Sequence, residues 1–211
     1  MTASLRAFDH ILPYQPWAKA RRDAVMMDYL HPSPSEIDSQ TRGWPNGVPR
    51  ENYYTSHDGS IGGPIQILQP PGHVVFFYET HHEFRIVPLD GRPHPGPSIK
   101  LWEGDSRGHW EGNSLVVDVT NLNDSTRFDA IGDFHSDAEH VIERWTFVDP
   151  NTIDYKATID DPKVFTRPWT IAVRHTRNPP DSEIMEYAGV EGDTAVATAA
   201  AIAAARQKEH Y

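Results

Sequence analysis

The sequence predicts a mainly β protein: an antiparallel, lipocalin-like barrel of about eight strands. From residue 64 onward, apolar residues recur with a period of two in short runs that turn residues separate. Strands and helices do not alternate along the chain, which disfavours a parallel sheet. Hydrophobic residues make up 38% of the 211 positions, enough for a substantial core. A sandwich of two sheets is the alternative architecture.

The chain divides into an N-terminal arm, a β-domain and a C-terminal helix, which together form a single domain. The arm covers residues 1–50 and begins with a helical pattern at Trp17–Tyr29, preceded by Pro16. The segment that follows is rich in proline and turn residues, and is either an ordered irregular arm or a linker. The β-domain covers 51–192. Residues 193–211 are rich in alanine and predict the C-terminal helix.

The β-domain contains runs with strand character, each ended by turn residues. The clearest hairpin joins 140–148 to 152–159 through Asp149, Pro150 and Asn151. The long connection 121–139 is of the kind that is often functional or mobile. In order, the predicted strand segments are 64–69, 73–79, 82–89, 100–112, 114–120, 140–148, 152–159, 169–176 and 183–189.

Charge and composition narrow the function classes. The formal net charge of −11 disfavours nucleic acid and anionic membranes as partners, because both are bound by neutralising phosphate. With no cysteine, disulfides, thiolate nucleophiles and cysteine-ligated zinc are excluded. The N-terminus does not read as a signal peptide, and no apolar run is long enough to span a bilayer. We therefore expect a cytoplasmic protein.

Glu143 is the strongest anomaly in the pattern. Strand alternation places it on the apolar face between Val141 and Trp145. A buried carboxylate must be paired, protonated or in a wet cavity, because burying an unpaired charge is costly. It is either a general acid or base, or half of a structural pair with Arg85 or Arg167.

Three histidines are candidates for proton transfer. His135 lies in the loop before the Glu143 strand, where it forms an acid–base pair with that carboxylate or serves as a cap or surface residue. His82 and His175 fall on apolar strand faces, where the ordinary alternative is a satisfied core histidine. His81 and His82 are neighbours on a predicted strand and point to opposite faces, so they do not share one metal ion.

Aromatic side chains exceed what a minimal core needs. They line a small-molecule pocket or simply fill the barrel. Arg167 either offers its planar guanidinium to a carboxylate ligand or pairs with Asp160 or Asp161. The aromatic candidates are Tyr78, Trp102, Trp110, Trp145, Tyr155 and Trp169.

Recognised catalytic signatures are missing from the sequence. It contains no nucleophile elbow, no phosphate-binding glycine loop, no dinucleotide fingerprint and no HExxH motif. We therefore expect no cofactor and no metal, although a histidine and carboxylate site assembled from separate strands stays open.

Five segments together resemble a large family of uncharacterised, mostly exported, β-rich proteins of soil bacteria. They are YETHHEFRIVPLDGRPH (78–94), GDSRGHWEGNSLVVDVTNLND (104–124), HSDAEHVIERWTF (135–147), TIDDPKVFTRPWT (158–170) and MEYAGVEGD (185–193). The resemblance covers roughly residues 40–195 and carries no general activity. Relatives often have cysteines where Gly43 and Gly189 stand here, so the absence of both fits a reducing compartment. The matching polar and aromatic positions are Arg85, His94, Trp102, Trp110, Glu111, Asp118, Asn123, His135, Glu143, Arg144, Arg167, Trp169, Glu186 and Tyr187.

The leading functional hypothesis is a cofactor-independent lyase, hydratase or isomerase acting on a small hydrophobic or aromatic molecule in a barrel pocket. Glu143 and His135 would transfer protons, with His82 in reserve. A non-catalytic small-molecule-binding protein, or a structural domain that forms a homodimer, are the alternatives. The expected binding residues are Tyr78, Arg85, Trp102, Trp110, Asp118, Asn123, Arg167, Trp169, His175 and Tyr187.

Overall fold

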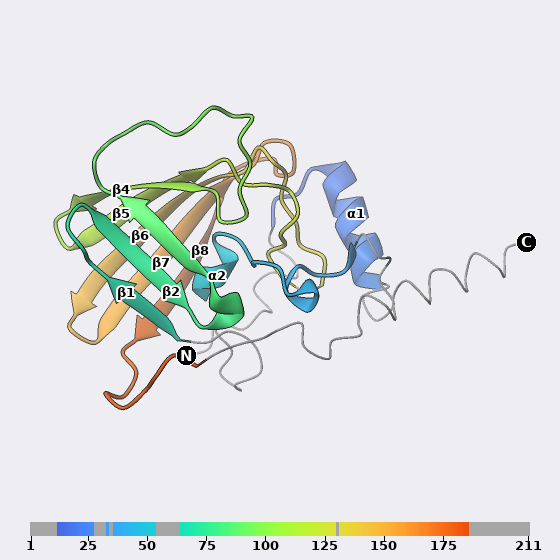
Figure 1. Ribbon diagram of the computed structural model, residues 1–211. Coiled ribbons are helices and arrows are strands. Elements are labelled where there is room, and N and C mark those ends of the chain that lie inside the picture. The colour runs from blue at the N-terminus through green and yellow to red at the C-terminus, as the bar shows by residue number, and fades with distance from the viewer. Residues whose placement is uncertain (1–11, 28–32, 34–35, 54–63, 130, 186–211) are drawn as a thin grey trace, which may run out of the picture.

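The computed structural model describes residues 12–27, 33, 36–53, 64–129 and 131–185, and the fold is built from two antiparallel sheets (Figure 1). The smaller sheet has three strands, β1 (Ile65–Leu68), β2 (His73–Tyr78) and β3 (Phe84–Pro88). The larger sheet has five strands in chain order: β4 (Asp105–Glu111), β5 (Ser114–Thr120), β6 (His140–Asp149), β7 (Thr152–Asp160) and β8 (Trp169–Thr176).

The strands pair with their neighbours in sequence because short turns join most of them. Gly112 adopts φ 60° in the turn between β4 and β5, where a residue without Cβ avoids strain. In the β6–β7 hairpin, Trp145 lies opposite Tyr155 and Val141 opposite Ile159. This register puts the apolar residues of both strands on the same face, as the period of two predicts.

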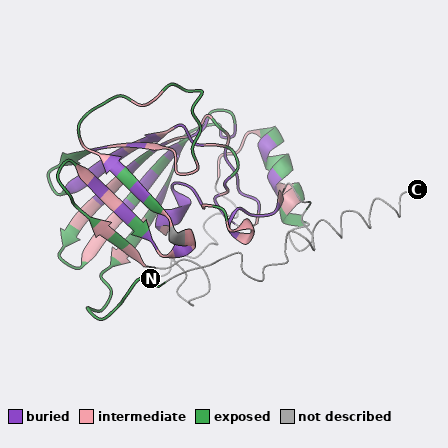
Figure 2. Cartoon of the chain, in the orientation of Figure 1, coloured by how far each residue is buried: buried purple, intermediate pink, exposed green. Residues whose placement is uncertain are grey.

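The core lies between the two sheets, whose inner faces alternate with exposed positions along each strand (Figure 2). Phe76 of β2 meets Trp145 of β6 across this gap, with ring centroids 4.7 Å apart. Val117 of β5, Tyr155 of β7 and the Trp145 ring are buried in the same layer. Aromatic side chains of both sheets therefore pack against one another in the core between them.

Helices lie beside and between the sheets. Helix α1 (Pro16–Met27) packs against the loops at one end of the molecule (Figure 1), and the short 3₁₀ helix η3 (Gln40–Arg42) follows in the arm. Helix α2 (Arg50–Tyr53) enters the space between the two sheets, where Asn52 contacts Tyr78 of the small sheet and Glu143 of the large one. The described part of the chain contains no helix long and apolar enough to cross a membrane.

The β-rich architecture confirms the predicted class, but it differs from the prediction in several details. In the described residues the hydrogen-bonded ladders form two separate sheets, so the sandwich alternative describes their pairing better than a continuous barrel. The segment 100–112 contributes one strand, β4, because its first residues form turns. Residues 183–185 carry no strand, and the rest of the predicted last strand lies outside the described residues, as does the predicted C-terminal helix.

The strand predicted from His82 begins later than expected. Residues Thr80–His82 form the 3₁₀ turn η4, with His81 at φ 57°, and β3 starts at Phe84. The parity of β3 is also opposite to expectation: Arg85 and Val87 are buried, whereas Phe84 and Ile86 are exposed. The strand therefore sends the charged side chain of Arg85, rather than those of Phe84 and Ile86, toward the core.

Candidate functional site

Glu143 occupies the middle of the space between the sheets and is fully buried. Nη1 of Arg85, from the facing strand β3, donates to Glu143 Oε1 at 3.1 Å, and Nη2 donates to Oε2. Tyr155 donates its hydroxyl to Oε1 at 2.8 Å. Nδ2 of Asn52 donates to the same oxygen at 2.6 Å. The carboxylate therefore has a complete set of partners, one of them a paired guanidinium.

A second set of hydrogen bonds holds these partners in place. Tyr78 donates its hydroxyl to Oδ1 of Asn52 at 2.8 Å, and Nε of Arg85 donates to Oγ of Ser106 at 2.8 Å. Burial raises the pKa of Tyr78 and of Tyr155, so both hydroxyls keep their protons. Every member is thus oriented by another, which is the pattern of a satisfied structural network.

This network agrees with the structural interpretation of Glu143 and identifies its arginine. Arg85 is the partner, because the parity of β3 turns it inward. Arg167 lies in the β7–β8 connection and is exposed. The buried Asp161 of the same connection accepts hydrogen bonds from Ser136.

His135 belongs to a different buried group, in the loop before β6. Its Nδ1 lies 2.8 Å from Oε2 of Glu139, and its Nε2 makes a hydrogen bond of 2.6 Å with Oγ1 of Thr126. Burial by itself lowers the pKa of His135, but the charge of Glu139 outweighs it and the pKa is raised. The carboxylate that meets this histidine is therefore Glu139, not Glu143.

The prediction that His135 pairs with Glu143 is wrong, because His135 pairs with Glu139. Sequence reasoning missed Glu139, although the spacing of four in HSDAEH was a usable signal once the segment is read as a turn. It also missed Thr126 and Asn52, which carry no pattern of their own.

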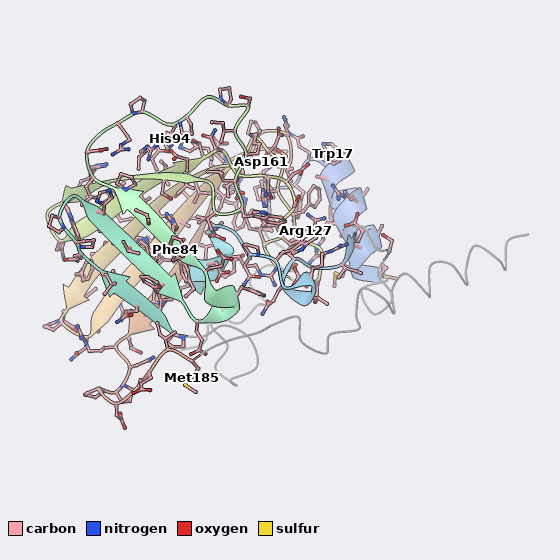
Figure 3. All side chains as sticks on the ribbon, viewed as in Figure 1. Trp17, Phe84, His94, Arg127, Asp161 and Met185 are labelled. Atoms are coloured by element: carbon pink, nitrogen blue, oxygen red, sulfur yellow. The ribbon has the colours of Figure 1, made fainter. Side chains whose placement is uncertain are left out.

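A pocket of about 470 Å³ lies between α1, the arm and the loop that carries His135. Trp17 and Arg127 lie on this side of the molecule, near α1 (Figure 3). Trp17 and Arg21 are one turn apart on α1 and therefore share a face of the helix. The lining residues are Trp17, Arg21, Ile37, Arg42, Trp44, Asp124, Ser125, Arg127, Phe134, His135 and Ser136.

Buried contacts fix the walls of this pocket. Arg22 of α1 donates from Nε to Oδ1 of Asp133 at 2.8 Å, and Tyr14 donates to the same oxygen at 2.8 Å. The main-chain N–H and hydroxyl of Ser136 donate to the two oxygens of Asp161 at 2.6 and 2.8 Å. The helix and the loop are therefore held by ion pairs and hydrogen bonds on their inner sides.

Some predicted binding residues lie in the core. Tyr78 is part of the Glu143 network, and Trp169 packs edge-on against Phe128 with ring centroids 5.2 Å apart. His175 stacks on Trp145 at 5.5 Å, and burial lowers its pKa. These three side chains thus act as core residues, the ordinary alternative.

The other predicted residues are dispersed. Trp102 touches the pocket indirectly, through its packing on Trp44 at 5.3 Å. Trp110 is exposed at the far end of β4 and packs against Phe147. Asp118 on the outer face of β5 accepts from His140, and Asn123 accepts from the N–H of Ser125 in a local turn.

The last two candidates are His82 and Tyr187. His82 ends the turn η4 and does not lie on a strand, and Tyr187 lies outside the described residues. Among the residues the structure describes, no group of three or more His, Asp or Glu side chains is arranged to hold a metal ion.

No protein-family model, curated protein or solved structure matches this chain.

Proposed function

We propose that this protein binds a small, partly aromatic molecule in the pocket beside α1. The observation that carries the proposal is a pocket of about 470 Å³ with two tryptophans in its wall. This volume falls in the range of about 300–1,000 Å³ that small-molecule sites occupy.

The exposure of the tryptophans supports a ligand. The exposed fraction is 54% for Trp17 and 39% for Trp44, although both line the same concave surface. Exposed aromatic side chains gathered in one hollow mark binding sites, whereas single ones on a convex surface need no explanation. Phe134 extends the aromatic wall, with its ring 5.9 Å from that of Trp17.

The space between the sheets is a poorer place for the ligand. Phe76, Trp145 and Tyr155 pack against one another there, and the Glu143 network engages the inward polar atoms. We also propose that the two sheets close into a lipocalin-like scaffold. This scaffold supports a binding site at one end of the molecule and does not enclose the ligand between the sheets.

The test is calorimetry with 2-naphthol and 2-naphthoate on the wild-type chain and on single tryptophan variants. Trp17→Ala and Trp44→Ala should each weaken binding by about tenfold, the loss expected when one stacking surface is removed. Trp110→Ala is the matched control, because Trp110 is 41% exposed but lies outside the lining. Equal losses in all three variants, or no binding to the wild type, would overturn the proposal.

A second candidate function is general acid–base catalysis in the same pocket, by a lyase, hydratase or isomerase. It is favoured by His135, which lines the pocket while Glu139 and Thr126 engage its two ring nitrogens. A histidine that a carboxylate orients in this way would exchange protons with a ligand through the Thr126 hydroxyl on its other ring nitrogen.

Proton transfer is measured by NMR, as exchange of carbon-bound hydrogens of a bound ligand in deuterated water. An acid–base enzyme should catalyse this exchange, and His135→Gln should abolish it while Trp17-dependent binding persists. Binding without exchange for every bound compound would leave the protein as a binder and remove the catalytic candidate.

A further inference from the structure

We infer that the ligand of this pocket carries an oxyanion, a carboxylate or a phosphate, which arginine side chains of the lining bind. The inference rests on the proposed function and adds the chemical class of the ligand. It places the charged group beside Arg42 and Arg127, with the ring of the ligand against the tryptophans.

The first support is the sign of the local charge. The chain has 30 acidic and 19 basic residues, yet the described lining contains three arginines and one carboxylate, Asp124. Even with Glu36, which pairs with Arg21 and Arg127, the site holds more positive than negative side chains, which favours an anionic ligand. Arginine in place of lysine also favours recognition of a carboxylate or a phosphate by paired N–H donors.

Glu36 shows how a carboxylate fits beside these arginines. Its Oε1 lies 3.2 Å from Nη2 of Arg21, and its Oε2 lies 3.6 Å from Nη2 of Arg127. Two guanidinium groups from separate segments therefore converge on one carboxylate of the chain itself. An oxyanion entering the pocket would interact with the same positive charges, and Glu36 competes with it.

Arg127 is more deeply placed than Arg21, with 11% of its side chain exposed against 43%. Burial lowers its pKa, Glu36 raises it and Arg21 lowers it again. A guanidinium that is poorly solvated and has another nearby is further stabilised by an added anion. Its Nη1 donates to the carbonyl oxygens of Asp124 and Thr126 at 3.2 and 3.0 Å, which holds the group in one orientation.

Stacking orients the other two arginines. The guanidinium of Arg42 lies over the ring of Trp44 at 4.6 Å, and that of Arg21 lies over the ring of Phe134 at 4.4 Å. Nε of Arg42 also donates to the carbonyl oxygen of Ile37 at 3.3 Å. Cation–π contacts of this kind keep a guanidinium flat against the wall. The pocket therefore presents ring surfaces and guanidinium groups side by side.

The experiment uses a matched set of three probes and two variants with opposite expected effects. Calorimetry compares 2-naphthoate and 2-naphthyl phosphate with the neutral 2-naphthamide on the full chain. We expect both anions to bind about tenfold more tightly than the amide, and Arg42→Gln to remove that preference. Glu36→Gln should strengthen binding of the anions several-fold, because it removes the competing carboxylate. A purely structural role of Glu36 would only weaken binding.

Arg174→Gln is the control for net charge, because Arg174 is an exposed arginine on β8, paired with Asp154 far from the lining. Circular dichroism establishes that each variant is folded before binding is measured. If the amide binds as tightly as the anions, or Glu36→Gln weakens their binding, the anionic class is wrong while the pocket stands. If neither anion nor amide binds, both the inference and the proposed function fail.

Discussion

Arg85 and Glu143 face one another across the gap between the two sheets, and both terminal nitrogens of the guanidinium donate to the carboxylate. Their side chains are 2% and 0% exposed, so the pair is separated from solvent. Burial lowers the pKa of Arg85, and Glu143 more than reverses that effect. Each charge is therefore acceptable in the core only because the other is present.

Glu143→Gln should destabilise the fold strongly, because it leaves the guanidinium of Arg85 buried without a counter-charge. We expect a loss of about 3–5 kcal/mol in the free energy of unfolding, measured by urea denaturation. Asp154→Asn is the control, since it breaks only the exposed pair with Arg174 and should leave stability nearly unchanged. The double variant Arg85→Leu, Glu143→Leu should recover most of the loss. Equal losses of stability in Glu143→Gln and Asp154→Asn would contradict the stabilising role of the buried pair of Arg85 and Glu143.

Stability should fall as the pH rises from about 5 to 7. Burial raises the pKa of Glu51 from its ordinary 4.5 to about 7. Between these values the folded chain keeps a proton that the unfolded chain releases, so unfolding becomes easier by about 1.4 kcal/mol per pH unit. The stabilisation of the fold by the proton on Glu51 is fully present below pH 4.5 and is lost above about pH 7.

Urea denaturation at intervals from pH 5 to pH 8 measures this dependence. Glu51→Gln should reduce the slope without abolishing it, because burial also raises the pKa of Asp129 to about 7. The glutamine can still accept the hydrogen bond from the N–H of Asn46. Glu111→Gln, with its side chain 49% exposed, should leave the slope unchanged. A slope in Glu51→Gln equal to that of the wild-type chain would assign the effect to other groups.

Gly47→Ala should disturb the His135 group. Gly47 has φ +77°, and a Cβ there would lie 2.7 Å from Oγ1 of Thr126, which bonds His135. We expect about 1 kcal/mol from backbone strain and about 1–3 kcal/mol more from the clash. Gly72→Ala is a close control, with φ +75° and no atom within 4 Å of its Cβ.

Denaturation measures both glycine variants, and the NMR signals of His135 report the local change. Only Gly47→Ala should shift these signals. Equal stability losses in the two variants would mean that Thr126 moves aside without cost.

Asp133→Asn should loosen α1 and with it the pocket. Asp133 holds Nε of Arg22 at 2.8 Å, and the side chain of Arg22 is 7% exposed, so the change removes the nearer of its two carboxylates and leaves the one of Asp23 at 3.7 Å. We expect faster hydrogen exchange in α1 and a loss of about 3 kcal/mol or more in stability. Lys19→Gln removes an exposed pair on the same helix and should leave exchange unchanged. Unchanged exchange in Asp133→Asn would show that apolar packing alone holds α1.

The predictable part of the fold is local. The alternation in 140–148 placed Val141, Glu143 and Trp145 on one face, and the structure buries all three. The hairpin to β7 also follows, because Pro150 and its neighbours form a turn between two alternating runs. The strand from His82 failed because a turn with positive φ at His81 carries no clear sequence signal.

The candidate site was predicted only in part. His135 was identified from its loop and lines the pocket, but its partner is Glu139. Trp17 and Arg21 look like one face of an ordinary helix, and Trp44 lies in a proline-rich arm. Nothing in these separate patterns indicates that they meet at the loop carrying His135. Their meeting depends on the docking of α1 through Arg22 onto Asp133.

The sequence by itself established the β class, the strand order along the chain and the inward direction of Glu143, because backbone geometry turns a period of two into two faces. Only the tertiary structure decided that Arg85 meets that carboxylate, and that α1, the arm and the loop form a pocket. Contacts between residues far apart in the chain depend on how sheets and helices pack, and packing is a property of complementary surfaces rather than of any local pattern.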